Sequence, residues 1–371
     1  MTPSMGSRGG HTGEARDRKG SIMERLKKAM LLVAVLGLVA APTTAGALSG
    51  LSGPVFGLGT APNGDLLVAD SSDGILGLRN DAVTSTWPAF GLTDVAAIGR
   101  GTGWATRGTV DDPTTDNGQA LYRISEDGAE LIANLFEFES TVNPDGHDPP
   151  DSNPYAVLAE HGRSALVIDA GGNSLLRVHR SGDIDVLAVF PDELVSTANL
   201  KSLAGCPDAP PDLEFACDLP AEIPGEAVPT SIARGPDGWL YVGELKGFPA
   251  PTGESNVWKV APDADWAECG TSPDCVKVFD GGFTSVIDLV FGSDGTLYVA
   301  ELDESSWLAV EFQLPGTLGG TVNACDLETL SCADVISGVP ILTALAIDGD
   351  GTLWATRNAL IPNMAEVFPV D

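Results

Sequence analysis

The segment that decides the fold is VPTSIARGPDGWLYVGE, residues 228–244. Two short apolar runs flank Asp237-Gly238, and a dipeptide of this kind between apolar runs is a strong local signal for a β-hairpin. The second run is apolar on consecutive positions, so we expect both of its faces to be covered. A strand covered on both faces is typical of the second strand of a propeller blade, which lies between two neighbouring blades.

The same pattern occurs six times along the chain. The other copies are VFGLGTAPNGDLLVAD (55–70), DVAAI with GTGWATR (94–98 and 101–107), NPYAVL with SALVID (153–158 and 164–169), VIDLVFGSDGTLYVAE (286–301) and LTALAIDGDGTLWATR (342–357). The spacing leaves room for two more strands in each unit, which predicts an all-β fold, a six-bladed β-propeller of four-stranded antiparallel blades. We expect blades at about 53–92, 93–150, 151–227, 228–283, 284–341 and 342–371, the last closed by 48–52.

Residues 1–47 have the features of a secretory signal peptide with an extended leader. Seven of the 20 basic residues lie in residues 1–28, and an apolar run from Ala29 to Ala41 follows. This run is shorter than the roughly 18 residues of a membrane-spanning helix. Ala45-x-Ala47 supplies the small residues of a cleavage site. We therefore expect Sec-type export, cleavage after Ala47 and no transmembrane anchor afterwards, with Met23 as the true start; an uncleaved membrane anchor is the alternative.

The charge of the chain excludes one large class of partner. Its 371 residues include 52 acidic and 20 basic side chains, a formal charge of −32, and cleavage after Ala47 would make this −36. Nucleic-acid binding needs a footprint of lysine and arginine, which this chain lacks. The hydrophobic content of 43% is too high for a disordered chain. We expect a soluble, secreted, monomeric protein.

All six cysteines follow residue 47 and fall into three close pairs. The pairs are Cys206 with Cys217, Cys269 with Cys275, and Cys325 with Cys332. An even count in an exported chain predicts disulfides, and proximity favours these three bonds among the 15 possible connectivities. No cysteine–histidine cluster suggests zinc.

The three predicted disulfides fall in different parts of the repeat. The first lies in a Pro-rich insertion at about 191–227, which we expect either to cap a channel mouth or to be an inert loop. The second would tie the loop before the outermost strand of the fourth blade. The third, between Cys325 and Cys332, would tie a hairpin of the fifth blade.

Several further segments resemble the ScyD/ScyE family of secreted bacterial propellers. They are NPDG (143–146), DSNPY (151–155), DAGGN (169–173), VPTS (228–231), VGELKGFP (242–249) and FTSVIDL (283–289). The resemblance covers essentially all of 48–371. The family is named from genes in the cluster for scytonemin, a cyanobacterial sunscreen pigment, and no reaction is established for it. The repeat is more distantly similar to NHL-type propellers and to the SMP-30/gluconolactonase group, but only in fold, and a fold does not define a function.

Two aspartates are candidates for a site on the channel axis. Asp94 and Asp288 occupy aligned positions of inner strands three blades apart, so we expect them to face each other across the axis. With Asn153 they could hold Ca²⁺ or another divalent cation. They could also form a catalytic acid/base pair if burial raises one pKa. The alternative that we favour is that each caps the backbone of a neighbouring strand.

The resemblance to the gluconolactonase group bears on the same residues. In that group a Glu, an Asn and an Asp hold a divalent cation, and Asn153 and Asp288 are the counterparts that the resemblance implies here. The Glu has no counterpart, because the first inner strand begins GPVF at 53–56 without an acid. This departure weakens the prediction of a lactonase.

We expect any ligand to bind at the channel mouth where inner strands begin and second strands end. The residues predicted to contact it are Asp151, Asn153, Tyr155, Thr230 and Glu244. A column of charged residues ends the second strands, and we interpret it as a structural ion network between blades: Asp70, Arg107, Asp169, Glu244, Glu301 and Arg357. The loop DGHDPPD at 145–151 has oxygen donors that suit Ca²⁺, with a solvated loop as the favoured alternative.

No complete catalytic constellation is present in the sequence. The three histidines after residue 47 are not placed for a triad, and there is no Gly-x-Ser-x-Gly elbow. We therefore favour a secreted binding or scaffold protein for a small molecule, a glycan or a protein. One alternative is a metal-dependent hydrolase or lactonase-like enzyme using Asp94, Asn153 and Asp288. The other, from the resemblance alone, is an accessory protein of extracytoplasmic aromatic-pigment metabolism.

Overall fold

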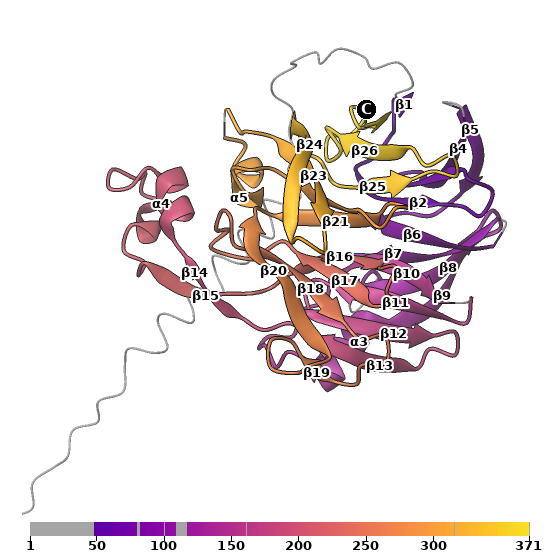
Figure 1. Ribbon diagram of the computed structural model, residues 1–371, viewed down its shortest axis with the longest axis horizontal. Helices are drawn as coiled ribbons and strands as arrows, with labels where there is room; N and C mark the ends of the chain where they lie inside the picture. Colours follow the sequence, from indigo (N-terminus) through magenta and orange to yellow (C-terminus); the bar gives the residue numbers. More distant parts are fainter. Residues whose placement is uncertain are drawn as a thin grey trace, which may run out of the picture. The chain divides into compact units, whose positions relative to one another are not determined.

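The computed structural model describes residues 48–79, 82–99, 101–108, 117–160, 162–314 and 316–370. The predicted signal peptide, its cleavage after Ala47 and the start at Met23 lie outside these residues. Six four-stranded antiparallel sheets form the body of the described chain, and their innermost strands contact one another in sequence around a closed ring (Figure 1). This arrangement confirms the predicted six-bladed β-propeller.

The strands of the first five blades follow chain order from the axis outward. The first blade is β2 (Val55–Thr60), β3 (Leu66–Asp70), β4 (Gly74–Arg79) and β5 (Ala82–Trp87). The second is β6 (Leu92–Gly99), β7 (Thr102–Arg107), β8 (Ala120–Ser125) and β9 (Gly128–Asn134). The third is β10 (Pro154–Glu160), β11 (Ser164–Asp169), β12 (Ser174–His179) and β13 (Ile184–Val189), extended by the parallel strand β19 (Ala267–Glu268).

The remaining blades follow the same plan, except that the last is completed by the start of the described chain. The fourth blade is β16 (Pro229–Arg234), β17 (Leu240–Glu244), β18 (Ser255–Val260) and β20 (Cys275–Phe283). The fifth is β21 (Val286–Phe291), β22 (Leu297–Glu301), β23 (Gly320–Asp326) and β24 (Ser331–Val339). The sixth is β25 (Leu345–Ile347), β26 (Leu353–Arg357), β27 (Glu366–Pro369) and β1 (Leu48–Ser49). Leu48 pairs with Val367, which closes the ring as predicted.

The core lies between blades rather than within one sheet. The second strands β3 and β17 are buried at every position, as the unbroken apolar runs predict. Each is packed by residues of the blades on either side, so six apolar clusters follow one another around the ring. No helix of the described residues is long and apolar enough to cross a membrane.

All three predicted disulfides are formed. They join Cys206 to Cys217, Cys269 to Cys275, and Cys325 to Cys332. The third ties the hairpin of the fifth blade as predicted, because Cys325 and Cys332 lie opposite each other in the register of β23 and β24. Cys325 is buried, whereas Cys332 lies in the exposed stretch of the outermost strand. Three disulfides suggest an extracytoplasmic protein.

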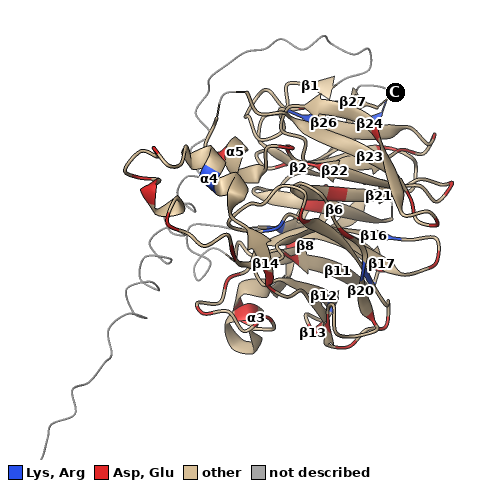
Figure 2. Ribbon diagram, turned by 60° about the vertical axis from the view of Figure 1, so that its left-hand side comes forward, with Lys and Arg blue, Asp and Glu red and all other residues tan. Residues whose placement is uncertain are grey.

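The non-blade elements lie in the loops that enter inner strands or leave second strands. They are the helix α3 (Leu135–Val142), the hairpin β14 (Glu193–Ser196) and β15 (Glu222–Gly225), α4 (Ala198–Ala204), the 3-10 turn η1 (Glu214–Ala216) and α5 (Trp307–Glu311). In an antiparallel blade these two kinds of loop share one end, so the additions decorate one face of the ring. We call it the insertion face; α3, β14, α4 and α5 lie on the left in Figure 2.

Candidate functional site

Asp94 and Asp288 occupy equivalent places in the second and fifth blades. Asp94 pairs with Thr106 on the next strand and Asp288 pairs with Ala300, and in both blades a β-bulge lies immediately before the aspartate. A bulge inserts one extra residue and redirects the neighbouring side chains. The alignment of inner strands made from the sequence is therefore correct in register at these two positions.

Each aspartate ties its own inner strand to that of the next blade. The Asp94 carboxylate accepts hydrogen bonds from the backbone N–H groups of Val95 (2.8 Å) and Val157 of the third blade (2.8 Å). The Asp288 carboxylate accepts from Leu289 (2.8 Å) and Leu345 of the sixth blade (2.7 Å). The innermost strands have an unpaired edge at the axis, and these bonds satisfy part of it. The favoured prediction, that each aspartate caps a neighbouring backbone, matches these contacts.

The pair is also electrostatically unusual. Burial raises the pKa of Asp288 to about 7, even though two N–H donors act in the opposite direction. Burial, and then the charge of Asp288, raise the pKa of Asp94 well above its ordinary value. The charge of Asp288 therefore reaches Asp94 across the axis. The same environment, followed by the charges of both aspartates, raises the pKa of the Tyr155 phenol far above its usual range.

Apolar side chains from alternate blades fill the axis beside this pair. Phe56, Tyr155 and Ile287 occupy the bulges of the first, third and fifth inner strands. The rings of Phe56 and Tyr155 meet edge to face with centroids 6.4 Å apart, and Tyr155 and Ile287 belong to one apolar cluster.

The corresponding residues of the other three blades are threonines that bond the next blade. Thr93 Oγ1 donates to the carbonyl of Pro154 (2.9 Å), Thr230 Oγ1 to that of Val286 (2.7 Å) and Thr343 Oγ1 to that of Val55 (2.7 Å). Of the residues predicted to contact a ligand, Tyr155 therefore helps to fill the axis and Thr230 joins two blades.

Asn153 lies at the entry to the third inner strand, beside Gly108 and Asp169. Its side-chain Oδ1 lies 2.6 Å from where a Cβ on Gly108 would stand, and its backbone N–H donates to Asp169 (2.6 Å). Asp151 lies close enough to Asp169 to act on its pKa. Across the described residues, no three Asp, Glu, His or Cys side chains are grouped as a metal centre. The donor set Asp94, Asn153 and Asp288 stays a prediction, because that grouping does not include asparagine.

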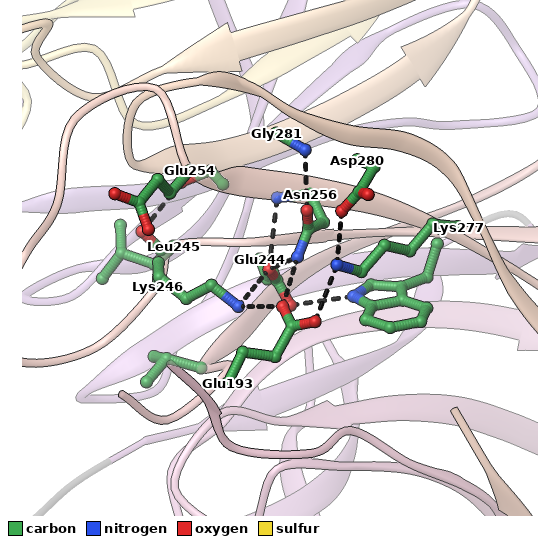
Figure 3. A network of polar contacts seen from close by, with 12 residues as sticks. Glu193, Glu244, Leu245, Lys246, Glu254, Asn256, Lys277, Asp280 and Gly281 are labelled. Carbon is green, nitrogen blue, oxygen red and sulfur yellow. Dashed lines mark hydrogen bonds and ion pairs between the residues drawn. The ribbon is translucent and has the colours of Figure 1, made fainter. Parts of the chain in front are cut away.

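Glu244, the fifth predicted contact residue, is the centre of a buried polar network (Figure 3). It is wholly buried, and Lys246 Nζ lies 2.7 Å from Glu244 Oε1 and 2.7 Å from Glu193 Oε2. Glu193 belongs to β14, so the lysine fastens the disulfide-stapled insertion to the fourth blade. The remaining members of the network are Asn256, Trp258, Lys277, Asp280 and Gly281. Sequence reasoning missed this contact, because Glu193 and Lys246 are 53 residues apart.

The acids that end the second strands bind loops of their own blades. Asp70 accepts from the backbone N–H groups of Gly53, Ser72 and Asp73. Arg357 pairs with Glu366 on the adjacent strand of its own blade. These contacts agree with the structural role that we expected for this column. For Asp70 and Arg357, however, the contacts lie within one blade, whereas we expected ion pairs between blades.

Comparisons with known proteins support the fold but assign neither a family nor a function. No protein-family model matches the chain, and no curated protein matches it. Among solved structures, regucalcin, a calcium-binding protein from Agrobacterium tumefaciens, has a TM-score of 0.50 at 13% identity, over 87% of this chain and 93% of that one. A gluconolactonase from Xanthomonas campestris has 0.49 at 13%, over 88% of each chain. The soluble aldose sugar dehydrogenase of Escherichia coli has 0.48 at 13%, over 88% and 99%. The likeness to regucalcin, at 13% identity, concerns the fold alone.

Proposed function

We propose that this protein is an exported binding propeller that recognises a partner protein on its insertion face and catalyses no reaction of its own. The observation that supports this most is a set of exposed apolar side chains on that face. They are Phe90, Val142, Leu194 and Leu318, and three of them are more than 60% exposed. They come from four different loops, so they are spread over the face rather than forming one loop tip.

The contacts at the axis favour a large partner over a small one. Phe56 and Tyr155 pack together there, Ile287 is buried, and Thr230 and Glu244 are used in internal bonds. Exposed apolar side chains with polar residues around them mark a protein-interaction site where they form one patch. A small molecule or a glycan remains the alternative ligand.

The test compares the two ends of the ring. The purified protein and its variants are immobilised, and proteins of the source organism's culture medium are captured and identified. Leu194→Asp and Leu318→Asp should abolish capture of a partner that the wild type retains. Leu330→Asp is the matched control, since Leu330 is 56% exposed in the turn between β23 and β24, at the opposite end. Equal capture by all variants would refute binding at the insertion face.

A second candidate function is hydrolysis at the axis by a metal-dependent, lactonase-like mechanism. It is favoured by the raised pKa of Asp288, because a carboxyl that titrates near neutrality suits acid–base chemistry. The metal fits poorly, since the first inner strand has no counterpart of the Glu that the gluconolactonase group uses. The test is to measure the metal content of the wild type and of Asp288→Asn and to screen lactones as substrates. A bound metal that the variant loses, together with lactone hydrolysis, would favour this enzyme over the binding propeller.

The resemblance to the ScyD/ScyE family is the basis of a third candidate. It would make the chain an accessory protein of extracytoplasmic aromatic-pigment metabolism. A pigment gene cluster around the gene for this chain is the observation that would support it, and its absence would leave the binding function.

A further inference from the structure

A glutamate on the insertion face is buried without any hydrogen-bond partner. Glu139, on α3, is 1% exposed, and neither carboxylate oxygen has a partner. Its Oε2 lies 2.7 Å from where a Cβ on Gly172 would stand, and Cγ of Asp169 lies 3.4 Å from the same point. The unpartnered carboxylate is therefore directed at the end of β11, beside a second buried carboxylate. Leaving such a group unsatisfied is costly.

The surroundings of Glu139 add negative charge rather than compensating it. Besides Asp169, Asp145 and Asp151 lie close enough to act on it, and together with burial they raise the pKa of Glu139 to about 8. The Asp145 side chain is only 4% exposed. His147 is the positive group that acts against this rise in pKa. It already forms ion pairs with three other acids: Asp145, Asp192 and Glu226.

The fourth blade shows how this chain neutralises a buried acid in the equivalent place. Glu244 and Asp169 both end the second strand of their blade. At Glu244 the positive charge is the ammonium group of Lys246, at 2.7 Å. At Asp169 the neighbour is the carboxylate of Glu139 instead, so the third blade has an additional anion where the fourth has a cation.

The other unpartnered polar atoms nearby are also oxygens. Asn143 lies four residues after Glu139 at the end of α3, and its backbone N–H donates to the Glu139 carbonyl; its buried Oδ1 has no partner. Ser174 pairs directly with Asp169 across β11 and β12, which places the two side chains on the same face, and its Oγ is buried and unpartnered. Oxygens without donors are what a hard cation requires.

We propose that the buried acidic cluster between α3 and the end of β11 is a Ca²⁺ site formed by Glu139, Asp169 and Asn143. Ca²⁺ takes six to eight oxygen ligands, including amide and backbone oxygens and water, so two carboxylates suffice. This is compatible with the absence, in the described part of the chain, of a ready cluster of three acidic, His or Cys side chains. The site is separate from the axis and independent of the proposed binding function.

The test is calcium binding by the purified protein, first treated with a chelator and then titrated calorimetrically with CaCl₂. We expect one site per chain with a Kd of about 10⁻⁴–10⁻³ M, the range of extracellular calcium modules. Glu139→Gln keeps the side-chain shape but removes the charge, and should weaken binding at least tenfold. Asn143→Gly keeps the left-handed backbone at φ 49° and removes the amide oxygen, so it tests the site if the first variant folds poorly.

Glu311→Gln is the matched control. Glu311 is likewise an unpartnered glutamate whose pKa burial raises, to about 7, but the shift has no contribution from neighbouring acids. Its variant should bind Ca²⁺ as the wild type does. No saturable binding in the wild type, or equal weakening in Glu139→Gln and Glu311→Gln, would overturn the proposal and leave a protonated Glu139.

Discussion

Replacing Lys246 by Met tests whether the network of Figure 3 depends on its buried charge. Methionine has a similar length, so the packing of the stem is largely kept. The change leaves Glu244, which is wholly buried, and Glu193 facing each other without the ammonium group that lies 2.7 Å from each. Removing one partner of a buried ion pair costs about 3–5 kcal/mol. We expect the lower end, because Glu244 keeps donors from Asn256 and from Trp258 Nε1 at 2.8 Å.

The assay is urea unfolding at pH 7 with the disulfides intact, read as a lower midpoint at unchanged slope. Lys259→Met is the matched control. Lys259 Nζ lies 2.6 Å from Asp237, but the two side chains are 28% and 37% exposed, so its loss should cost about 0–1 kcal/mol. The double variant Lys246→Met with Glu244→Gln removes the stranded charge and should recover more than half of the loss. Two outcomes would refute the reasoning. One is a loss of stability in Lys246→Met that lies within about 1 kcal/mol of the loss in Lys259→Met, the range expected for an exposed pair. The other is a double variant that recovers none of the loss.

Three further outcomes follow from the contacts described. Burial raises the pKa of Asp288 to about 7, whereas an unfolded Asp titrates at about 3.9. Protonation of this carboxyl therefore contributes its full stabilisation below about pH 4, and this contribution is lost as pH rises through about 7. Asp288→Asn should flatten this decline in unfolding free energy, and parallel curves from about pH 4 to 8 would contradict it. Gly57→Ala places a Cβ against Asp94 Oδ1 and should lower stability by about 1–3 kcal/mol in urea unfolding; an unchanged midpoint would count against that packing. Replacing Cys206 and Cys217 by Ser should cost about 2–3 kcal/mol and speed proteolysis within 191–227, and unchanged cleavage would show that the loop is held by other contacts.

The blades could be predicted from the sequence because their signals are local. An Asp-Gly turn between apolar runs needs no information from elsewhere in the chain. The closure of the ring by Leu48 was also predictable, since the sixth unit lacked one strand. The disulfides followed from proximity in sequence; Cys325 and Cys332, for example, are only seven residues apart and flank one hairpin turn.

The insertion face could not be predicted to the same depth, because its contacts join distant segments. Nothing near Lys246 in the sequence indicates that Glu193 will fold back onto it. The helix α3 did carry a local signal: Asn134 caps it by accepting from the backbone N–H of Glu137, as in the Asn-x-x-Glu pattern of a capping box. That signal indicates where the helix begins, but it does not indicate that Glu139 is buried beside Asp169, which is 30 residues later in the chain.

The scarcity of lysine explains why Glu244 has a paired cation and Glu139, in the part of the chain that the structure describes, has none. After residue 47 the chain has four lysines, and each has a partner elsewhere: Lys201 binds the Leu219 carbonyl, Lys259 binds Asp237, and Lys246 and Lys277 bind Glu193. No hydrogen-bond partner reaches the Glu139 oxygens within the described residues. A strongly acidic chain keeps its surface soluble but lacks cations for its interior. A buried acid cluster without a paired cation is neutralised by protons or by a metal ion. The comparison of Glu139→Gln with Glu311→Gln distinguishes these two solutions.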